Sequence, residues 1–573
     1  CYGLINYHDK IALWPFAHGG AHPGFGAAII TQSGMLSSDL TMSQRHLPLS
    51  YMVSVGNQAS LRLEDFIDIF LEERHVRAIG LHIEAIHDTE KFASAAMRAI
   101  EKNIPIVALK TGVSEIGARL TTSHTGSLSG TDATYSAFFK RLGICRVATP
   151  SELVELLKFL TIAGVPTGPK IAGFTCSGGG ATMLADSAAP LELDFVQPSS
   201  HTATTLTQLL PHTATVTNPL DYTTPIWGDY ERTLPVFKCL LKDEYDSAVL
   251  VQDYPAAGLD ESKPHYRADS DSFIKACRTA NIPAAICSTL PENLDAETRS
   301  HVLQAGVAPM QGIETCMEAI NAAANYGKRR AVLLANPLHP FRRAEVMGSS
   351  FRQLDEATAK SILAKAGLHV PPFHQLPMAK ALSDKLDQID LVYPVAAKIC
   401  SSDICHKTEI GGVHLNITSL SELSAAIDHI ITSVERNAPD AQLDGILIES
   451  MINNAILELM VNLRRDPQFG LVLTVASGGV MTEILQDAST VLVPADDVSL
   501  QSSIDSLRIA PLFNGFRGGQ AASRTAVLDQ IKCLVSLMDG APDIIETEIN
   551  PMMVGTDYAC CADALISISS TAA

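Results

Sequence analysis

Basic residues are scarce in this chain. Lys and Arg number 42 against 62 Asp and Glu, so the formal net charge is −20 at pH 7. A surface that binds nucleic-acid phosphates needs a basic stripe, so this composition argues against a nucleic-acid partner. Any anionic ligand must therefore be held by local groups, such as helix N-termini and a few lysines.

Cysteine pairs of the CxxC type are absent, although the chain has twelve cysteines. A disulfide framework or a zinc site would need other spacings, so neither is expected. Scattered cysteines are typical of reduced, buried thiols, which favours a cytoplasmic protein. Apolar runs of the ~18 residues that a membrane helix needs are also missing, so we expect no membrane partner.

Internal repeats and low-complexity tracts are missing as well. What the chain has is length and apolar content, with 573 residues of which 46% are hydrophobic. A single core cannot serve a chain of this length, so three or four globular domains are expected.

Short apolar runs alternate with helical periodicity over residues 27–160, beginning with "GAAIITQSGML". The same alternation restarts at "GPKIAGFTCSGGGATML" and continues to about residue 326. Strands that alternate with helices indicate parallel sheets, so the sequence predicts two doubly wound α/β units in series. Beyond residue 350 strands outnumber helices and turns are short, which predicts an α+β domain.

Small residues follow a buried strand at Ser33–Gly34 and again at Ser177–Gly178–Gly179. At such a turn the first N–H groups of the helix are unpaired and its dipole is positive, which suits a phosphate. Taken singly, each of these two turns could also be an ordinary strand–helix connection without a ligand. Ligands of doubly wound sheets bind at the carboxyl ends of the strands, so the two turns could face one another.

His124 lies in the small-residue stretch "SHTGSLSG". A neutral imidazole is a good nucleophile towards phosphorus, and the N–P bond that it forms is labile. The same small residues are also ordinary helix-capping material. Glu84 follows the strand of "LHIEAI" and could hold an imidazole in one tautomer, or it could be an exposed charge at a strand end.

The C-terminal third places Lys398 on the apolar strand "YPVAAKI", where a charge is costly unless it meets an anion. His406 and the glycine pair Gly411–Gly412 follow, and such glycines can approach phosphates closely. Glu449 is a carboxylate at a predicted hinge. There are simpler alternatives. The Lys398 side chain could extend from a strand end to solvent, and Glu449 could be an ordinary surface charge.

Glu548 and Asn550 lie two residues apart, on one face of the strand "ETEINPMM", and Asp563 follows thirteen residues after Asn550. Side-chain oxygens that converge from adjacent strands hold Mg²⁺ beside the phosphates of a nucleotide. The sequence therefore predicts a magnesium site here.

These stretches together resemble the NDP-forming acyl-CoA synthetases, the ADP-forming acetate–CoA ligase type related to succinyl-CoA synthetase. The resemblance covers essentially the whole chain. Its motifs, all in one order, include "SVGNQASL", "SHTGSLSGTDA", "TCSGGGATMLADSA", "ELMVNLRRDPQFG", "PLFNGFRGG" and "EINPMMV". It implies an acid–thiol ligase that uses ATP or ADP, Mg²⁺ and CoA on a carboxylic acid, and a homo-oligomer (dimer or tetramer).

The resemblance also implies roles for single residues. His124 matches the histidine that is phosphorylated at the acyl site, and Glu84 the glutamate that supports it. His406 matches a second histidine, proposed to carry phosphate from the nucleotide domain. The remaining matches are phosphate-cradling helix N-termini at Ser33–Gly34 and Ser177–Gly178–Gly179, nucleotide contacts at Lys398 and Glu449, and Mg²⁺ ligands at Asn550 and Asp563.

By the same resemblance, the two α/β units are flavodoxin-like and the last domain is an ATP-grasp domain. The chain opens on "CYGLIN", where the family's CoA-binding domain ends, so most of that domain is expected to be missing. The predicted parts are a remnant of the CoA-binding domain at 1–20, flavodoxin-like domains at 21–165 and 166–326, a linker at 327–350 and an ATP-grasp domain at 351–573.

Two alternatives to acyl-CoA synthesis stay open. One is an enzyme on the same framework that cleaves or transfers a transient acyl-CoA, with Tyr222 and Trp227 near the acid pocket. The other is a non-catalytic sensor of nucleotide or acyl-CoA. The acid, and the choice between ATP and GTP, are not given by the sequence.

Overall fold

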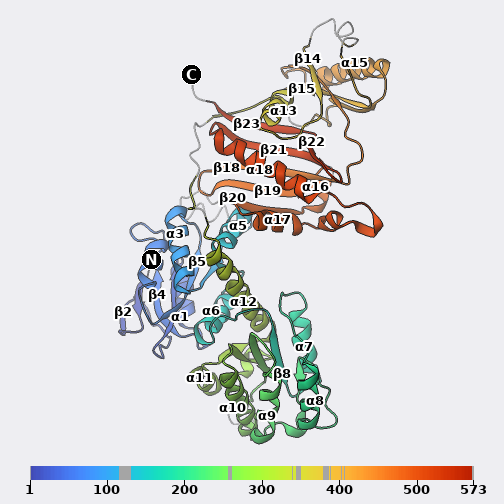
Figure 1. Cartoon of the computed structure of the whole chain (residues 1–573). Helices are drawn as coiled ribbons and strands as arrows, with labels where there is room; N and C mark the ends of the chain where they lie inside the picture. The colour runs from blue at the N-terminus through green and yellow to red at the C-terminus, as the bar shows by residue number, and fades with distance from the viewer. Residues whose placement is uncertain are drawn as a thin grey trace. The chain divides into compact units, whose positions relative to one another are not determined.

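The computed structural model divides the chain into two compact units (Figure 1). Unit 1 is Cys1–Asp132 with Phe139–Phe341, and unit 2 is Ala133–Phe138 with Arg342–Ala573. The structure describes residues 2–114, 116, 131–255, 261–338, 340–343, 350–378, 386, 389–401, 403–404, 407–479 and 481–570.

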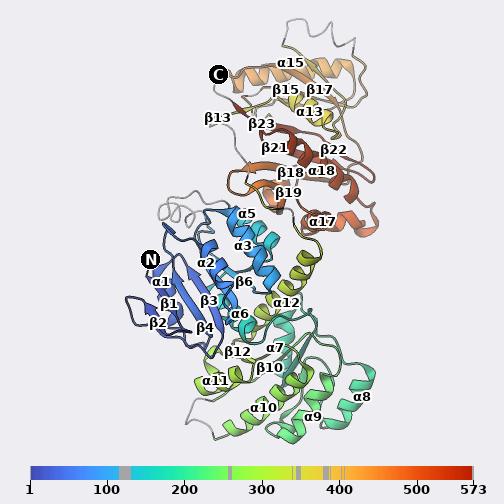
Figure 2. The ribbon, with the colours of Figure 1, turned by 60° about the vertical axis from the view of Figure 1, so that its left-hand side comes forward.

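The first sheet of unit 1 has seven strands in the order β2-β1-β4-β3-β5-β6-β7 (Figure 2). The strands from β3 to β7 pair in parallel, whereas β1 pairs antiparallel with β4, and β2 with β1. The strands are β1 (Gly3–Asn6), β2 (Ile11–Leu13), β3 (Gly26–Thr31), β4 (Leu49–Ser54), β5 (Val76–Ile83), β6 (Ile106–Lys110) and β7 (Cys145–Val147). The helices are α1 (Gly34–Thr41), α2 (Leu63–Phe70), α3 (Thr89–Lys102), α5 (Asp132–Leu142) and α6 (Pro150–Ile162).

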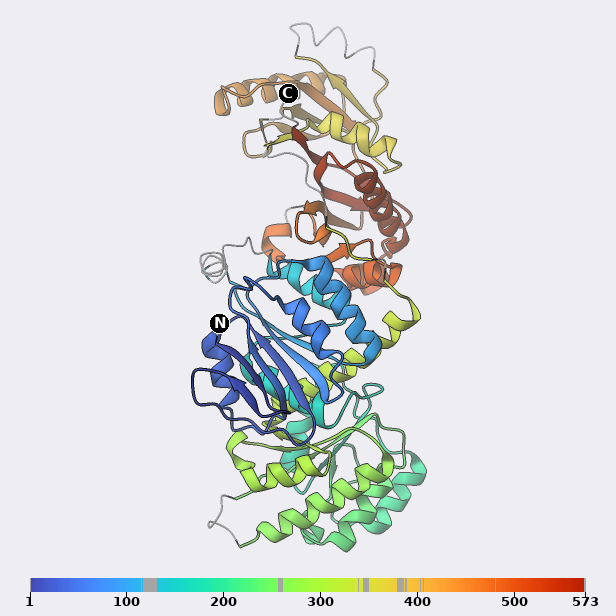
Figure 3. The same ribbon diagram turned by 90° about the vertical axis from the view of Figure 1, so that its left-hand side faces the viewer.

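The second sheet of unit 1 has five strands, all parallel, in the order β12-β11-β10-β8-β9. Helices cover it, and α9 packs beside α10 in the green part of the ribbon (Figure 3). The strands are β8 (Ile171–Thr175), β9 (Leu220–Asp221), β10 (Ser247–Val251), β11 (Ala284–Ser288) and β12 (Ala308–Gln311). The helices are α7 (Gly178–Ala188), α8 (Ser200–Leu209), η1 (Thr224–Ile226), α9 (Tyr230–Leu240), α10 (Lys263–Ala280), η2 (Pro291–Asn293), α11 (Ala296–Gln304) and α12 (Ile313–Ala335).

One hydrophobic core joins both sheets of unit 1. Ile29 and Val107 of the first sheet belong to the same buried cluster as Val249 and Ala285 of the second, with α6 and α12 contributing. Buried parallel strands carry apolar residues on both faces, and all six residues of β3 are buried. The predicted pair of doubly wound α/β sheets is therefore confirmed.

Unit 2 contains two antiparallel sheets. The larger follows the path β13-β23-β21-β18-β19-β20, with β22 paired to β21, and the smaller has the order β14-β17-β15-β16. The strands are β13 (Ser350–Gln353), β14 (Phe373–Leu376), β15 (Val395–Cys400), β16 (Val413–Ile417), β17 (Gly445–Ser450), β18 (Leu457–Asp466), β19 (Gly470–Ser477), β20 (Ala488–Val493), β21 (Ile544–Val554), β22 (Ala559–Cys561) and β23 (Ala564–Ser570). The helices are α13 (Glu356–Lys365), α15 (Leu420–Asn437), α16 (Met481–Leu485), α17 (Asp497–Asp505), η3 (Ala510–Asn514), η4 (Phe516–Gly518) and α18 (Arg524–Gly540).

The α+β character predicted beyond residue 350 is confirmed by these antiparallel sheets. Among the helices that the structure describes, none is both long enough and apolar enough to cross a membrane.

Glu64, in the first turn of α2, is a buried carboxylate whose environment predicts a pH-dependent stability. Its side chain is 1% exposed, and within the described part of the chain neither carboxylate oxygen has a hydrogen-bond partner. The nearest cation is the Arg62 guanidinium, with Nη1 4.0 Å from Oε1. Burial raises the pKa of Glu64 to about 6.

Replacing Glu64 by glutamine is expected to stabilise unit 1 at pH 8 by about 2 kcal/mol, because a shift of this size penalises the charged form. The folded pKa lies above the unfolded value, so the native state holds the extra proton between pH 4.5 and 6, and stability falls as pH rises through that window. The gain should vanish at pH 4. Urea unfolding at both pH values measures it, with the exposed Glu101→Gln as control. An equal gain at both pH values would contradict the prediction.

Candidate functional site

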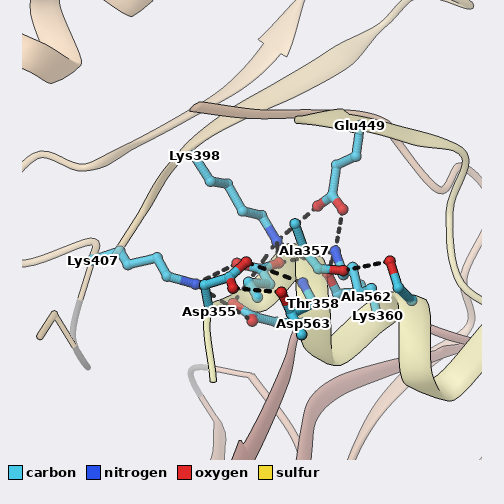
Figure 4. A network of polar contacts seen from close by, with 11 residues as sticks. Asp355, Ala357, Thr358, Lys360, Lys398, Lys407, Glu449, Ala562 and Asp563 are labelled. Atoms are coloured by element: carbon cyan, nitrogen blue, oxygen red, sulfur yellow. Dashed lines mark hydrogen bonds and ion pairs between the residues drawn. The ribbon is translucent and has the colours of Figure 1, made fainter. Parts of the chain in front are cut away.

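Six charged side chains meet in unit 2, where α13 lies between the two sheets (Figure 4). Strand β15 carries one lysine and β17 one glutamate, α13 provides an acid–base pair one turn apart, and the other two come from loops. They are Glu356, Lys360, Lys398, Lys407, Glu449 and Asp563, called here the lysine–carboxylate cluster. A large part of the predicted nucleotide site therefore lies in one place.

Lys398 lies at the centre of this cluster and is 7% exposed. Its Nζ lies 2.9 Å from Glu356 Oε1 and 2.7 Å from Glu449 Oε1. It also donates to the Ala562 carbonyl at 3.0 Å. Asp563 Oδ2 is farther away, at 3.8 Å. The ammonium group is thus held by two carboxylates and a carbonyl, and it faces a third carboxylate without close contact.

Lys360, fully buried on α13, makes a second set of contacts to the same acceptors. Its Nζ lies 2.9 Å from Glu356 Oε1 and donates to the Ala562 carbonyl at 2.8 Å and to Glu449 Oε2. The i, i+4 spacing of Glu356 and Lys360 places both on one face of the helix. Lys360 therefore forms ion pairs with the same two glutamates that contact Lys398.

Lys407 completes the cluster on the side of Asp563. Its Nζ donates to Glu356 Oε2 and lies 3.8 Å from Asp563 Oδ1. The Asp563 side chain is 37% exposed, whereas the side chains of Lys398 and Lys407 are 8% and 13% exposed. Asp563 is therefore the most solvent-exposed of these three groups.

Opposite charges balance in the cluster, and the pKa shifts follow from that balance. Burial alone would lower the pKa of Lys398, but Glu356, Asp563 and Glu449 outweigh it and raise the pKa well above its usual value. Burial would likewise raise the pKa of Glu356, but the three lysines hold it well below its usual value. The same acidic neighbours raise the pKa of Lys407, so Lys398 and Lys407 are cationic at neutral pH, as phosphate binding requires.

Of the predicted metal ligands, Glu548 and Asn550 lie on β21 of the larger sheet, and Asp563 lies in the loop between β22 and β23. The Asn550 N–H donates to the Asp563 carbonyl at 3.2 Å, and Asn550 Oδ1 accepts from the Gly479 N–H at 2.9 Å. Burial raises the pKa of Glu548, and the carboxylates of Glu546 and Asp563 raise it further, against a hydrogen bond from Asn462.

Crowded carboxylates of this kind fit a divalent cation, because a bound cation would relieve their repulsion. In the described part of the chain, no three His, Cys, Asp or Glu side chains form a ready-made metal site. The predicted set has two carboxylates and one amide. Its role as a metal site stays a prediction.

Gly411 and Gly412 are explained by packing within unit 2. Gly411 has a φ of +73°, which favours glycine. A Cβ on Gly412 would lie 2.7 Å from Ile399 Cγ2 and 2.9 Å from the Lys407 carbonyl oxygen. The glycine pair thus lets the Lys407 loop return tightly to β15, and its contact with phosphate stays a prediction.

The two predicted phosphate-binding turns begin helices in unit 1. Ser33 caps α1 by accepting from the Leu36 N–H at 3.3 Å, and Ser177 caps α7 by accepting from the Gly180 N–H at 3.4 Å. Gly34 faces the Tyr2 ring, since a Cβ there would lie 2.8 Å from it. A Cβ on Gly178 or Gly179 would meet only atoms 3.6 Å away. The α7 turn is therefore the more open of the two.

Glu84 follows β5 at the carboxyl edge of the first sheet. Gln32 holds the backbone there, because its Oε1 accepts from the N–H groups of Glu84 and Ala85. His124 and His406 lie outside the described residues, so the structure does not test their predicted contact with Glu84 or with the cluster.

Sequence reasoning missed His82 and Lys110 beside Glu84. His82 is 3% exposed, its Nε2 lies 3.1 Å from Thr111 Oγ1, and burial lowers its pKa to about 4. Burial also lowers the pKa of Lys110 to about 8. Lys110 is the last residue of β6 and His82 the last but one of β5, so a polar residue near the end of an apolar run was the available signal.

The two aromatic residues predicted near the acid pocket differ in their surroundings. Tyr222 is fully buried, and its hydroxyl donates to Asp269 Oδ2 at 2.7 Å. Trp227 lies edge-on to Tyr266 with ring centroids 4.8 Å apart. Packing accounts for Tyr222, and the contact of either ring with a substrate stays a prediction.

Comparisons with known proteins agree with this architecture. A family model described as a succinyl-CoA ligase like flavodoxin domain matches residues 25–160, and an ATP-grasp domain model matches residues 345–568. The ADP-forming acetate–CoA ligase I of Archaeoglobus fulgidus is 27% identical over 567 residues, which cover 97% of this chain and 79% of that protein.

The beta subunit of ADP-forming acetate–CoA ligase I from Pyrococcus furiosus is 33% identical over 217 residues, 37% of this chain and 90% of that subunit. Among solved structures, the dinucleotide forming acetyl-coenzyme A synthetase 1 of Ca. Korarchaeum cryptofilum, in complex with phosphate and ADP, shares the fold. Its TM-score is 0.51 at 23% identity, covering 59% of this chain and 72% of that chain. The chain therefore belongs to the family of ADP-forming acyl-CoA synthetases, and it is an acid–thiol ligase.

Proposed function

We propose that the protein converts a carboxylic acid, CoA and ATP to acyl-CoA, ADP and phosphate through a phosphohistidine and an acyl phosphate. The observation that carries the proposal is the lysine–carboxylate cluster, in which Lys398 on β15 and Lys407 in the following loop both approach Asp563. A buried pair of ammonium groups that opens on one side suits a polyphosphate.

In this proposal Lys398 and Lys407 turn from Asp563 to the phosphate oxygens when the nucleotide binds. Both contacts to Asp563 are long, at 3.8 Å, so little is lost when they are exchanged. Lys360 meanwhile keeps Glu356 and Glu449 paired. The contacts of Lys360 are therefore kept, while the anion that faces Lys398 and Lys407 changes from Asp563 to phosphate.

Glu548, Asn550 and Asp563 are the residues that would hold Mg²⁺. When bound, the ion would neutralise charge on the phosphates that are transferred. Asn462 positions this set from the neighbouring strand, because its Nδ2 donates to Glu546 Oε1 at 2.8 Å and to Glu548 Oε2 at 3.4 Å.

The group transfer is proposed to proceed in three displacements, or in four when His406 carries the phosphoryl group. An imidazole nitrogen of His124 attacks the γ-phosphorus of ATP, and the bond to the ADP oxygen breaks. On the route through His406, that histidine makes this first attack, and His124 then takes the phosphoryl group as the N–P bond to His406 breaks. A carboxylate oxygen of the acid then attacks the same phosphorus, and the N–P bond breaks. The CoA thiolate finally attacks the acyl carbon, and phosphate leaves.

The charged intermediates of this sequence need stabilisation at the acyl site. The N-termini of α1 and α7, capped by Ser33 and Ser177, are proposed to cradle the phosphoryl group, and Glu84 to orient the imidazole. The predicted division into flavodoxin-like domains at 21–165 and 166–326 and an ATP-grasp domain at 351–573 is part of the same proposal. So are a homo-oligomeric state and a cytoplasmic location.

Incubation with γ-³²P-ATP and Mg²⁺ tests the first displacement and needs neither the acid nor CoA. Wild-type protein is expected to acquire an acid-labile, base-stable label, as a phosphohistidine should. Lys398→Met is expected to slow labelling by at least tenfold, because a phosphate contact to a cation is lost. The exposed Lys365→Met on α13 is the matched control and should label like wild type. A folded wild-type protein that takes up no label would contradict the proposal.

A further inference from the structure

A second cleft in unit 2 is lined by arginines that the proposed reaction does not use. It has a volume of about 760 Å³ and lies where α17, η3, η4 and the start of α18 meet. The quoted motif "PLFNGFRGG" forms much of its wall. Lining residues important here are Asp505, Arg508, Asn514, Phe516, Arg517 and Arg524.

The lining of the cleft is basic in a strongly acidic chain. Arg508, Arg517 and Arg524 face it, with Asp505 as the acidic residue among those that line it. Arg524 Nη2 lies 2.8 Å from Asp505 Oδ1, whereas Arg508 and Arg517 form no ion pair with any residue that the structure describes. Two guanidinium groups without a carboxylate partner, in a chain of net charge −20, provide a site for an anion.

Arg524 has a further unused donor. Its Nε is buried and has no hydrogen-bond partner in the described part of the chain, while Nη2 lies 3.4 Å from Asn514 Oδ1. Arg524 is also the first residue of α18, a helix of 17 residues capped by Ser523. The helix dipole therefore adds positive charge at the position of this guanidinium.

An aromatic ring in the same cleft extends the site beyond phosphate. Phe516 is 53% exposed, and the Arg517 guanidinium lies 5.2 Å from its ring centroid. A flat base can stack on an exposed aromatic ring and on a guanidinium plane. The volume also lies in the range of small-molecule sites, roughly 300–1,000 Å³, so a base and its phosphates fit together.

We propose that this arginine cleft is a second ligand site of the chain, which binds an aromatic base that carries two or more phosphate groups. Free nucleotide and the nucleotide end of CoA both have this chemistry. The site is separate from the lysine–carboxylate cluster, since the two share no residue.

Isothermal titration of the full chain tests the proposal with three probes: ADP, adenosine 3′,5′-bisphosphate and inorganic pyrophosphate. The titrated proteins are wild type, Lys398→Met, and Lys398→Met combined with Arg508→Gln and Arg517→Gln. Lys532→Gln on α18, which removes one charge outside the cleft lining, is added to Lys398→Met as the control. All substituted side chains other than Lys398 are exposed, so the arginine variants and the Lys532→Gln control differ from their common parent, Lys398→Met, only at the surface.

Lys398→Met is expected to retain one site for ADP or for the bisphosphate, and the two arginine substitutions should raise its Kd at least tenfold. Lys532→Gln should change that Kd by less than twofold. Pyrophosphate should bind at least fivefold more weakly than the better nucleotide, because it cannot stack on Phe516. Tighter binding of ADP assigns the site to free nucleotide, and tighter binding of the bisphosphate assigns it to CoA.

Absence of any site in Lys398→Met, or a Kd that is unchanged by the arginine substitutions, would overturn the proposal. The result is independent of the proposed reaction. If Lys398 has no part in nucleotide binding, wild type and Lys398→Met will bind identically, and the arginine variants still decide whether the cleft is a site.

Discussion

When ATP phosphorylates His124 directly, replacing His124 by asparagine is expected to reduce the acid-labile label from γ-³²P-ATP to background, at least a hundredfold below wild type. Asparagine keeps a polar side chain of similar reach but has no nucleophilic nitrogen, so no N–P bond can form. Labelling for a fixed time, followed by parallel acid and base treatment, measures the loss. Overall acyl-CoA formation should fall by the same factor, because every turnover passes through this residue in the proposed reaction.

His406→Asn distinguishes the two proposed routes to His124. If His406 receives the phosphoryl group first, His124→Asn retains a small label that His406→Asn removes, and the double variant has none. If transfer is direct, His406→Asn labels like wild type. A label of wild-type size in the double variant would contradict the proposed histidine chemistry altogether, because neither imidazole would then be the acceptor.

The central strands of unit 1 were predictable because parallel strands are buried on both faces. Strand β3 reads "GAAIIT" and all its residues are buried, so an apolar run and a following small-residue turn sufficed. The β1–β2 hairpin shows the limit of this reasoning. All three residues of β2 are exposed, and β1 joins the sheet antiparallel through β4, more than forty residues along the chain. Neither local pattern nor periodicity encodes that pairing.

The candidate site was predictable where a charge interrupts an apolar strand, as Lys398 does in β15 and Glu449 does in β17. Glu356 and Lys360 give no such signal. In "LDEATAKSILAKAG" they have the i, i+4 spacing of an exposed helical ion pair, yet both are buried. Their burial follows from long-range contacts with Lys398, Glu449 and the Ala562 carbonyl, which only the fold brings together.

The buried position of Lys360 leads to the second large prediction, that Lys360→Met destabilises unit 2 by roughly 3–5 kcal/mol. Removing one partner of a buried ion pair leaves an uncompensated charge, and that is the costly event. Here the cluster would keep three carboxylates against two ammonium groups, with Glu449 Oε2 losing its partner. Urea unfolding monitored by far-ultraviolet circular dichroism measures the loss of stability. The exposed Lys365→Met should unfold like wild type.

The decisive arm is the double variant Lys360→Met with Glu449→Gln, in which one charge of each sign is removed. The remaining glutamate and aspartate balance Lys398 and Lys407, so the double variant is expected to be more stable than Lys360→Met alone, although it carries one more substitution. A double variant that is less stable than the single one would mean that packing of the lysine stem, not charge, makes Lys360 necessary. Charge balance would then not be what holds Lys398 and Lys407 ready for phosphate.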